Sequence, residues 1–314
     1  MLKLKEIKAW RPFYSTVGLL VFTFLAAIFI PEFRTPTNFV TILRQSCVLL
    51  VLATGLTAVL LTGGIDLSVP KTAGLIGCIC ARFLKMGVPT WSVILIAIAM
   101  GVIIGLSSGL LVSIVRLPSF VATYALNWVV SGLAMIVMSG AVIYDLPSNF
   151  TVLGTGYIGP IPVIVIVTLI IVLLVWFILQ KTTIGRDIFM YGNGPTAAKY
   201  AGVSLPKTII SAFILSSVCA GLAGVLMTAR LNAADAAMGD AYVLEPIAAI
   251  VIGGTSMLGG EGGVTGTIIG AILLTIIVNV MNLLGITSFA QPLVVGIVIL
   301  TIVFFDSFLK VKKN

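Results

Sequence analysis

Apolar runs long enough to cross a lipid bilayer follow one another along almost the entire sequence. A helix needs about 20 predominantly apolar residues to span the hydrocarbon core of a membrane. Hydrophobic residues make up 60% of the chain and charged residues only 9%, whereas a globular domain carries about 25% charged residues. The runs therefore exclude a soluble enzyme and predict an all-α integral membrane protein.

The runs predict about ten transmembrane helices in a single transmembrane domain over residues 1–314. The spans at 67–82 and 243–257 are short enough to be broken or tilted helices. The first run is longer than the apolar part of a signal peptide, and no small-residue cleavage site precedes Pro31, so we expect it to be retained. The expected spans are residues 13–30, 46–62, 67–82, 91–115, 119–138, 161–179, 208–229, 243–257, 264–284 and 289–308.

The chain carries a net charge of +8, but its basic residues gather at the ends of the expected spans and in both terminal tails. An excess of Lys and Arg marks the cytoplasmic side of a membrane protein. We therefore expect both termini in the cytoplasm and a lipid membrane, rather than nucleic acid, around the chain. Lys71 is the exception, because it lies inside an expected span.

The loop after the span at 208–229 lies outside the cell in this topology, and it is acidic. It contains Asp235, Asp240 and Glu245, whereas the cytoplasmic loops are basic. Either this loop is simply solvated, or it docks a separate extracytoplasmic partner.

Residues 181–207 form the longest polar segment between two expected spans. Nearly everything else in the chain could lie in hydrocarbon. We therefore expect this segment to be the one main cytoplasmic loop and the chain's chief surface for a partner outside the membrane.

Two glycine-rich breaks interrupt the apolar pattern, at residues 61–70 and 251–263, and each leads into a helix of small residues. Paired interruptions point towards a transport site, because irregular backbone at membrane depth needs protein or a water-filled cavity around it. The alternative is that the glycines let helices pack closely in lipid. The candidate path or gate residues here are Gly63, Gly64, Asp66, Gly253, Gly254, Thr255 and Ser256.

Each break contains one acidic residue, Asp66 in the first and Glu261 in the second. An ionisable group inside a membrane is a candidate functional site. The expected topology, however, puts both breaks at the cytoplasmic surface, where a carboxylate can cap the following helix. We favour capping over ion coupling for both residues.

Uncharged polar side chains inside the spans indicate the cargo. Tyr124, Asn127 and Ser131 share one helical face, and Asn279 and Asn282 share another. Hydroxyl and amide groups suit a neutral, hydroxyl-rich solute. A carboxylate-bearing cargo would favour a cationic site, and no mid-span position holds Lys or Arg apart from Lys71. The same residues equally suit hydrogen bonds between helices. We add Tyr124, Asn127, Asn279 and Asn282 to the candidate path residues.

Several motifs agree in order and spacing with one known family. They are Gly64-Ile65-Asp66-Leu67-Ser68-Val69, Gly185-Arg186, Gly192-Asn193-Gly194-Pro195-Thr196-Ala197-Ala198 with Gly202, Ala248-Ala249-Ile250-Val251-Ile252-Gly253-Gly254-Thr255-Ser256, Gly266-Thr267-Ile268-Ile269-Gly270-Ala271 and Asn282-Leu283-Leu284-Gly285. From about residue 38 to 306 the chain resembles the permease subunits of ribose-type ABC importers. Pro70, where the family often has Gly, and Ser131, where a basic residue is common, are departures.

The resemblance implies a monosaccharide permease of the bacterial cytoplasmic (inner) membrane. It implies a second permease subunit, identical or related, an extracytoplasmic sugar-binding protein and a cytoplasmic ATP-binding subunit. The segment 181–207 would hold the helix that couples to this ATPase, although the acid that often opens the motif is Thr196 here. The coupling residues implied in this way are Asn193, Gly194, Thr196, Ala197, Ala198 and Gly202.

The sequence lacks the G-x-x-x-x-G-K-[ST] loop that cradles nucleotide phosphates, and it has no histidine. Its four cysteines fall in apolar runs and read as small buried hydrophobes. We expect no catalytic residue, metal site or cofactor in this chain, with ATP and Mg bound by the partner ATPase. The alternatives are a permease for a furanose-like signalling molecule such as autoinducer-2 and an ion-coupled secondary sugar transporter.

Overall fold

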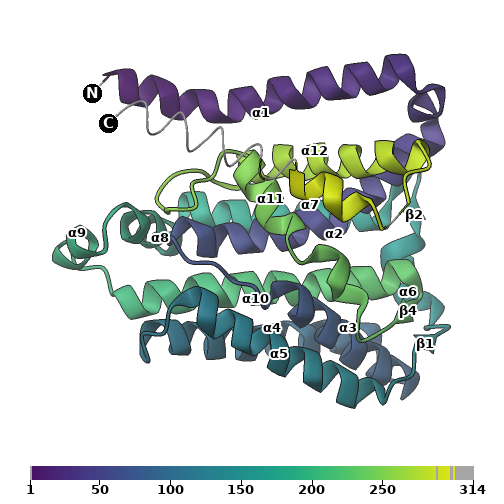
Figure 1. The fold of residues 1–314 in the computed structure, drawn as a ribbon. Helices are drawn as coiled ribbons and strands as arrows, with labels where there is room; N and C mark the ends of the chain where they lie inside the picture. The colour runs from purple at the N-terminus through teal and green to yellow at the C-terminus, as the bar shows by residue number, and fades with distance from the viewer. Residues whose placement is uncertain (1, 288, 298–299, 301–314) are drawn as a thin grey trace.

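The computed structural model describes residues 2–287, 289–297 and 300, and for residues 2–14 it describes the backbone alone. The described part is predominantly helical (Figure 1). Six of its helices are long and apolar enough to cross a membrane, which agrees with the predicted all-α membrane protein. They are α2 (Pro36–Leu61), α4 (Thr90–Ser113), α5 (Ser119–Met138), α7 (Val163–Lys181), α10 (Leu205–Leu231) and α12 (Val264–Leu283).

Three further helices occupy other expected spans. Helix α1 (Leu2–Phe29) covers the first, α3 (Val69–Lys85) the third, and α11 (Glu245–Ile252) part of the eighth. The expected span at 243–257, which its length allowed to be broken, is helical only over Glu245–Ile252, because Gly254 has a left-handed φ of 87° and the backbone turns there. The expected span at 289–308 lies largely outside the described residues, of which 291–297 are helical.

The segment 181–207 is not an irregular loop. It contains α8 (Thr183–Asn193) and α9 (Pro195–Tyr200), which lie together at the left end of the molecule in Figure 1. Gly194 separates the two helices, and Gly202, at a φ of 83°, follows the end of α9. We call this end of the molecule the α8–α9 end.

The opposite end, the strand end, carries the short irregular elements. Helix α6 (Ser148–Thr155) lies there with two antiparallel strand pairs (Figure 1). The pairs are β1 (Ile143–Tyr144) with β4 (Ala233–Ala234), and β2 (Tyr157–Ile158) with β3 (Ile161–Pro162). The 3-10 helices are η1 (Pro31–Arg34) and η2 (Met238–Tyr242).

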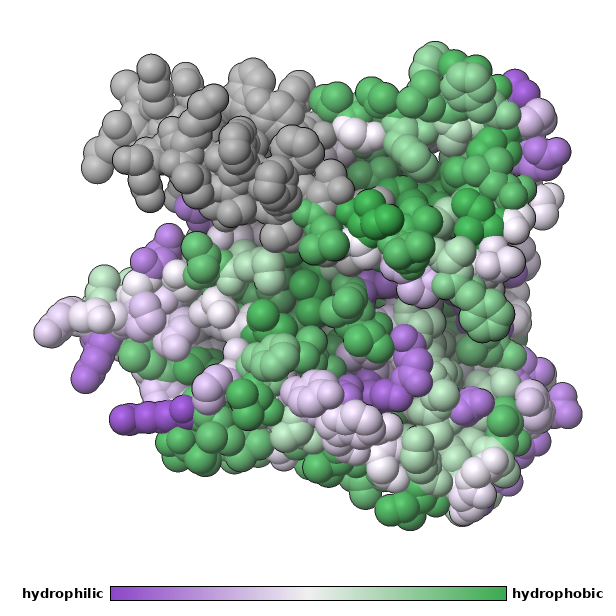
Figure 2. Space-filling model, viewed as in Figure 1, coloured by the Kyte–Doolittle hydropathy of each residue, from purple (hydrophilic) through white to green (hydrophobic). Residues whose placement is uncertain are grey.

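Helix α10 is the central helix, and small residues let its neighbours approach it closely. A Cβ at Gly101, Gly105 or Gly109 of α4 would lie within 2.8 Å of an α10 backbone atom, and a Cβ at Gly55 of α2 would overlap Cys219. Glycines four residues apart are a common device for close helix packing in membranes. Away from this centre, α4, α5 and α7 expose large apolar side chains, as hydrocarbon-facing helices do (Figure 2).

Candidate functional site

The two glycine-rich breaks, far apart in sequence, meet at the α8–α9 end. The backbone N–H of Gly260 donates to the Leu61 carbonyl oxygen at 2.9 Å. A Cβ on Gly259 would lie 2.7 Å from the Gly63 nitrogen, so the two backbones are in direct contact. Gly63 has a left-handed φ of 78° and ends α2, because its N–H bonds to the Leu60 carbonyl at 2.8 Å.

The last residues of α8 touch both breaks at the same point. The Asn193 side-chain amide donates to the Gly260 carbonyl at 3.2 Å and to the Phe189 carbonyl at 2.8 Å. A Cβ on Gly192 would overlap both the Leu61 carbonyl oxygen and the Gly260 nitrogen. Three segments that the sequence singled out therefore converge. We call this contact the glycine junction, and it comprises Leu61, Gly63, Gly192, Asn193, Gly259 and Gly260.

The second break is held closed by its own side chains. The Thr255 hydroxyl accepts from the Gly263 N–H at 3.2 Å, and the Ser256 hydroxyl accepts from the Leu258 N–H at 3.2 Å. Both side chains are buried. Gly253 lies so close to Gly266 of α12 that neither position has room for a Cβ. Thr255, Ser256 and Gly253 thus fix the turn and pack α11 against α12.

The first break runs back into the helix bundle as an irregular segment, residues 62–68, before α3 begins. Two hydroxyls of α5 bind its backbone. Ser119 accepts from the Ile65 N–H, and Thr123 accepts from the Leu67 N–H, both at 3.1 Å. Irregular backbone at membrane depth needs such protein partners. Ser119 and Thr123 were not among the residues predicted from the sequence. They are four residues apart, which places both on one face of the first turns of α5.

Asp66 lies inside the bundle and not at the membrane surface, which corrects the expected position. Its side chain is 1% exposed, and Oδ2 accepts from the hydroxyl of Ser216 at 3.3 Å. Ser216 lies near the middle of α10. Oδ1 accepts from the N–H and the hydroxyl of Ser68, the residue before α3, at 3.0 and 2.6 Å. Asp66 therefore joins the start of α3 to the central helix.

Of the polar residues that the sequence places on one face of α5, two are accessible and one is buried. Tyr124 is 47% exposed and stands between Phe120 and Trp128, with ring centroids 6.1 and 6.3 Å away. Asn127 is half-buried, whereas Ser131 is buried. Tyr124 and Asn127 thus share an accessible face that Ser131 does not reach.

Asn279 and Asn282 hold neighbouring segments together, which favours the alternative reading of these residues. Asn279 is buried and exchanges amide hydrogen bonds with Asn38 of α2, at 2.8 and 3.1 Å. Asn282 accepts from the Gln291 side chain at 2.7 Å. The sequence did not single out Asn38, because asparagine is common at helix starts and Asn38 lies in the first turn of α2.

Helix α9 offers one face to the outside and buries the other. Ala198 is 1% exposed and packs within the chain, whereas Thr196 and Ala197 are exposed and Tyr200 is 88% exposed. The Val203 N–H donates to the Ala198 carbonyl at 3.0 Å, which closes the end of α9 around Gly202. A groove of about 630 Å³ separates α9 from α8 and the end of α7, and Asn193, Gly194, Ala197 and Ala198 are among its lining residues.

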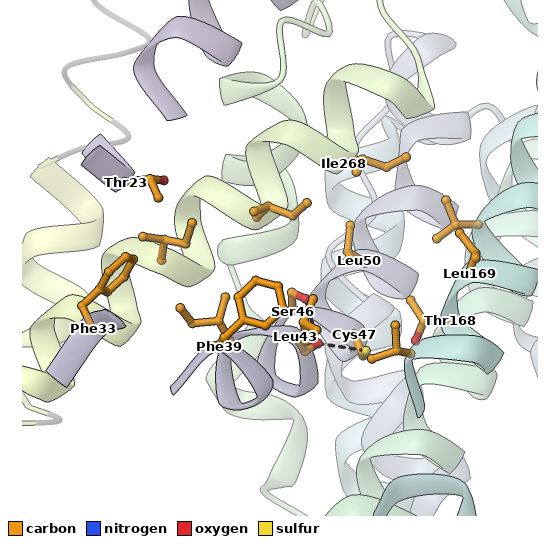
Figure 3. Close-up of a pocket in the computed structure, with 15 residues that line it drawn as sticks. Thr23, Phe33, Phe39, Leu43, Ser46, Cys47, Leu50, Thr168, Leu169 and Ile268 are labelled. Carbon is orange, nitrogen blue, oxygen red and sulfur yellow. Dashed lines mark hydrogen bonds between the residues drawn. The ribbon is translucent and has the colours of Figure 1, made fainter. Parts of the chain in front are cut away.

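A second cavity, of about 390 Å³, lies between α1, α2, α7 and α12 (Figure 3). Its lining is almost wholly apolar, and it includes none of the candidate path residues. A hydroxyl-rich solute would lose its hydrogen bonds to water there without replacement. This cavity therefore does not suit a sugar. Its lining residues are Thr23, Phe33, Phe39, Ile42, Leu43, Ser46, Cys47, Leu50, Val165, Thr168, Leu169, Val172, Ile268, Ile272 and Ile276.

Comparison with known proteins identifies the family. Residues 38–305 match the family described as branched-chain amino acid transport system / permease component, which agrees with the predicted extent of the resemblance. The chain is 35% identical to the ribose import permease protein RbsC of Haemophilus influenzae, over 95% of this chain and 94% of that protein. It is 36% identical to RbsC of Bacillus subtilis, over 92% and 91%. It is 34% identical to the D-allose transport system permease protein AlsC of Escherichia coli, over 88% and 85%.

No solved structure is significantly similar to the chain. The family match, the relatives and the six apolar helices agree with one another. The chain is therefore a multi-pass membrane protein that belongs to the permease family of the branched-chain amino acid transport system type, among members similar to ribose import permeases.

Proposed function

We propose that this chain is the permease subunit of an ABC importer that carries a monosaccharide, a ribose-like pentose or a hexose, across the bacterial inner membrane. The observation that carries the proposal is the similarity to ribose import permeases over more than nine-tenths of the chain. The glycine junction supports it, because it connects the segment suited to a partner outside the membrane with both broken segments inside it.

In this mechanism the chain moves and a partner hydrolyses ATP. The α8–α9 end faces the cytoplasm, with both termini, and a separate ATPase subunit holds ATP and Mg. Movement of that subunit displaces α8 and α9. Because Asn193 and Gly192 contact Gly260 and Leu61 directly, the displacement reaches both breaks. The short helices α3 and α11 then reorient and open the path alternately to each side.

Two further partners complete the importer. A second permease subunit lies across the path, and an extracytoplasmic binding protein delivers the sugar at the strand end. The path runs past Tyr124 and Asn127, whose accessible polar groups suit hydroxyl-bearing cargo. Asp66 is not included, because it is buried and its carboxylate is engaged by Ser68 and Ser216. The sequence-based candidates Asn279 and Asn282 are not included, because their amides are engaged between helices.

The test is uptake of a panel of labelled sugars by cells that lack the gene. The measurement is repeated in cells that carry it, with the membrane potential collapsed and ATP maintained. We expect loss of uptake of one monosaccharide on deletion, and uptake that survives the collapse in the presence of the gene. Uptake that stops with the potential would identify an ion-coupled secondary transporter and overturn the proposal.

Replacement of Tyr200 by alanine is expected to weaken the bond to the ATPase subunit. Tyr200 is 88% exposed on α9, so its removal costs little packing within the chain, and exposed tyrosines at interfaces are often worth about 2 kcal/mol or more. We expect about tenfold less ATPase subunit to copurify, and a proportional loss of uptake. Ile136→Ala, a 74% exposed position on α5, is the matched control and should change neither. Unchanged copurification with Tyr200→Ala would remove α9 from that interface.

A further inference from the structure

Lys71, the basic residue inside an expected span, forms an ion pair with Asp240 of η2. Asp240 belongs to the acidic stretch that the sequence places in an outer loop. The structure brings it inward, because the segment 235–242 packs on the first turns of α3. Gly239 approaches the Pro70 carbonyl so closely that a Cβ would overlap it, and a Cβ on Gly74 would contact the Gly239 nitrogen at 3.6 Å.

The pair lies well inside the membrane-spanning part of the protein. Helix α3 runs beside α10, with Ala73 packed against Gly224 and Gly77 against Thr228. Both helices run towards the strand end, and Gly224 lies two turns before the end of α10. Because Lys71 precedes Ala73, Lys71 lies further from the strand end than Gly224 does. An ionisable group at such a depth is expensive unless it is paired or lines a water-filled cavity.

Stability of α3 does not explain Lys71. The residue stands in the first turn of the helix, where the macrodipole is positive and a cation is unfavourable. Asp240 compensates this charge, but its own side chain is 51% exposed, whereas that of Lys71 is 15% exposed. A half-exposed carboxylate at this depth needs water rather than lipid. Figure 2 shows hydrophilic surface near the middle of the face in view, between apolar areas, as well as at its left and right edges.

We propose that Lys71 and Asp240 line a water-filled stretch of the translocation path, in the half of the membrane nearer the strand end, and present a charge-balanced polar contact to neutral cargo. The ammonium supplies hydrogen-bond donors and the carboxylate supplies acceptors, which suits sugar hydroxyls. Because the two charges cancel, the contact favours neither anionic nor cationic solutes. The role in sugar passage rests on the proposed function, whereas the water-filled site can be tested without it.

The test uses Asp240→Cys in the complete importer, in right-side-out membrane vesicles. Two membrane-impermeant thiosulfonate reagents are compared, one with a sulfonate and one with a trimethylammonium group. Each rate is divided by the rate of the same reagent with a free thiol in solution, because the thiolate itself favours the cationic reagent. We expect both reagents to modify the cysteine, and this relative rate to be roughly tenfold higher for the anionic reagent because Lys71 is left unpaired. Lys71→Gln, added to Asp240→Cys, should abolish this preference.

Two controls show whether reaction of the cysteine at position 240 reports contact with water. Leu174→Cys, on α7, has a similar exposed fraction, 57%, but on an apolar face, so lipid should shield it from both reagents. The unsubstituted protein sets the background, because its four cysteines are buried. Where Asp240→Cys lowers the amount of importer in the membrane, Ala241→Cys, an exposed neighbour, replaces it.

The result that overturns the site is a cysteine at 240 or 241 that reacts no faster than Leu174→Cys in an importer that transports sugar. That result leaves the proposed function standing. Equal relative rates for the two reagents would overturn the charge-balanced contact. Strong reactivity at position 240 or 241, together with vesicles of the unsubstituted importer that import no sugar of the panel, would retain the water-filled site and overturn the proposed function instead.

Discussion

Gly192→Ala is expected to reduce sugar uptake to less than about a tenth while the protein still accumulates in the membrane. Alanine stabilises an isolated helix relative to glycine by about 1 kcal/mol, so α8 itself should form well. The added Cβ, however, would overlap the Leu61 carbonyl oxygen and the Gly260 nitrogen. These are backbone atoms, which cannot rotate away, and overpacking of this kind typically costs about 1–3 kcal/mol. The glycine junction should therefore open.

The measurement is uptake by cells together with ATP hydrolysis by the reconstituted importer. With the junction open, we expect hydrolysis to continue but to lose its stimulation by the sugar-loaded binding protein. Gly18→Ala is the matched control, because Gly18 is also a helical glycine, in α1, and a Cβ there meets nothing within 4 Å. Normal uptake with Gly192→Ala would show that force does not pass through this contact. Equal losses with both substitutions would trace the effect to the added methyl group in any helix rather than to the glycine junction.

In the proposed mechanism, the two short helices α3 and α11 connect the glycine junction with the path, one from each break. Helix α11 packs on the first turns of α12, with Ala249 against Gly270, and so lies towards the α8–α9 end. Helix α3 lies along the part of α10 nearer the strand end. Each is too short to span about 30 Å of hydrocarbon alone. In both places a short helix is therefore continued by a non-helical or 3-10 segment inside the bundle.

Local patterns in the sequence were sufficient for the long helices and for the segment that holds α8 and α9. Apolar runs define a membrane helix by length and composition alone, and glycines at positive φ mark where α2 and α11 end. The polar contacts required more. Asn279 bonds to Asn38, 241 positions away, and Asp66 bonds to Ser216, 150 positions away. A single sequence does not say which distant side chain faces which.

The same limit explains the misplaced acids. Sequence topology assigns a residue to a side of the membrane by counting crossings, and it treats every break as a turn at the surface. Here the chain turns back into the bundle after Gly63, so Asp66 becomes buried and Asp240 approaches Lys71. Hydroxyl side chains such as Ser119 and Thr123 satisfy the re-entrant backbone. Isolated hydroxyl residues at the start of an apolar run do not change its periodicity, so the sequence pattern does not indicate that they bind the backbone of another segment.

Asp66→Ala is expected to lower the thermal stability of the purified protein and to abolish most uptake, whereas Asp66→Asn should retain at least about half of it. The carboxylate accepts three hydrogen bonds in a site that is 1% exposed. Alanine leaves the Ser68 and Ser216 donors without an acceptor, and each buried unsatisfied group costs about 1–3 kcal/mol. Asparagine keeps the shape, and its carbonyl oxygen still accepts from Ser68.

Asp235→Ala is the matched control for this pair of substitutions. Asp235 makes the same local contact, accepting from the backbone N–H two residues on, Ala237, at 2.8 Å, but in an exposed turn. We expect its removal to change the melting temperature and the uptake little. The comparison also separates the two readings of Asp66. A structural acceptor tolerates asparagine, whereas a group that binds a coupling ion needs its charge. Equal loss of uptake with asparagine and alanine, at unchanged thermal stability, would establish ion coupling and refute the capping role.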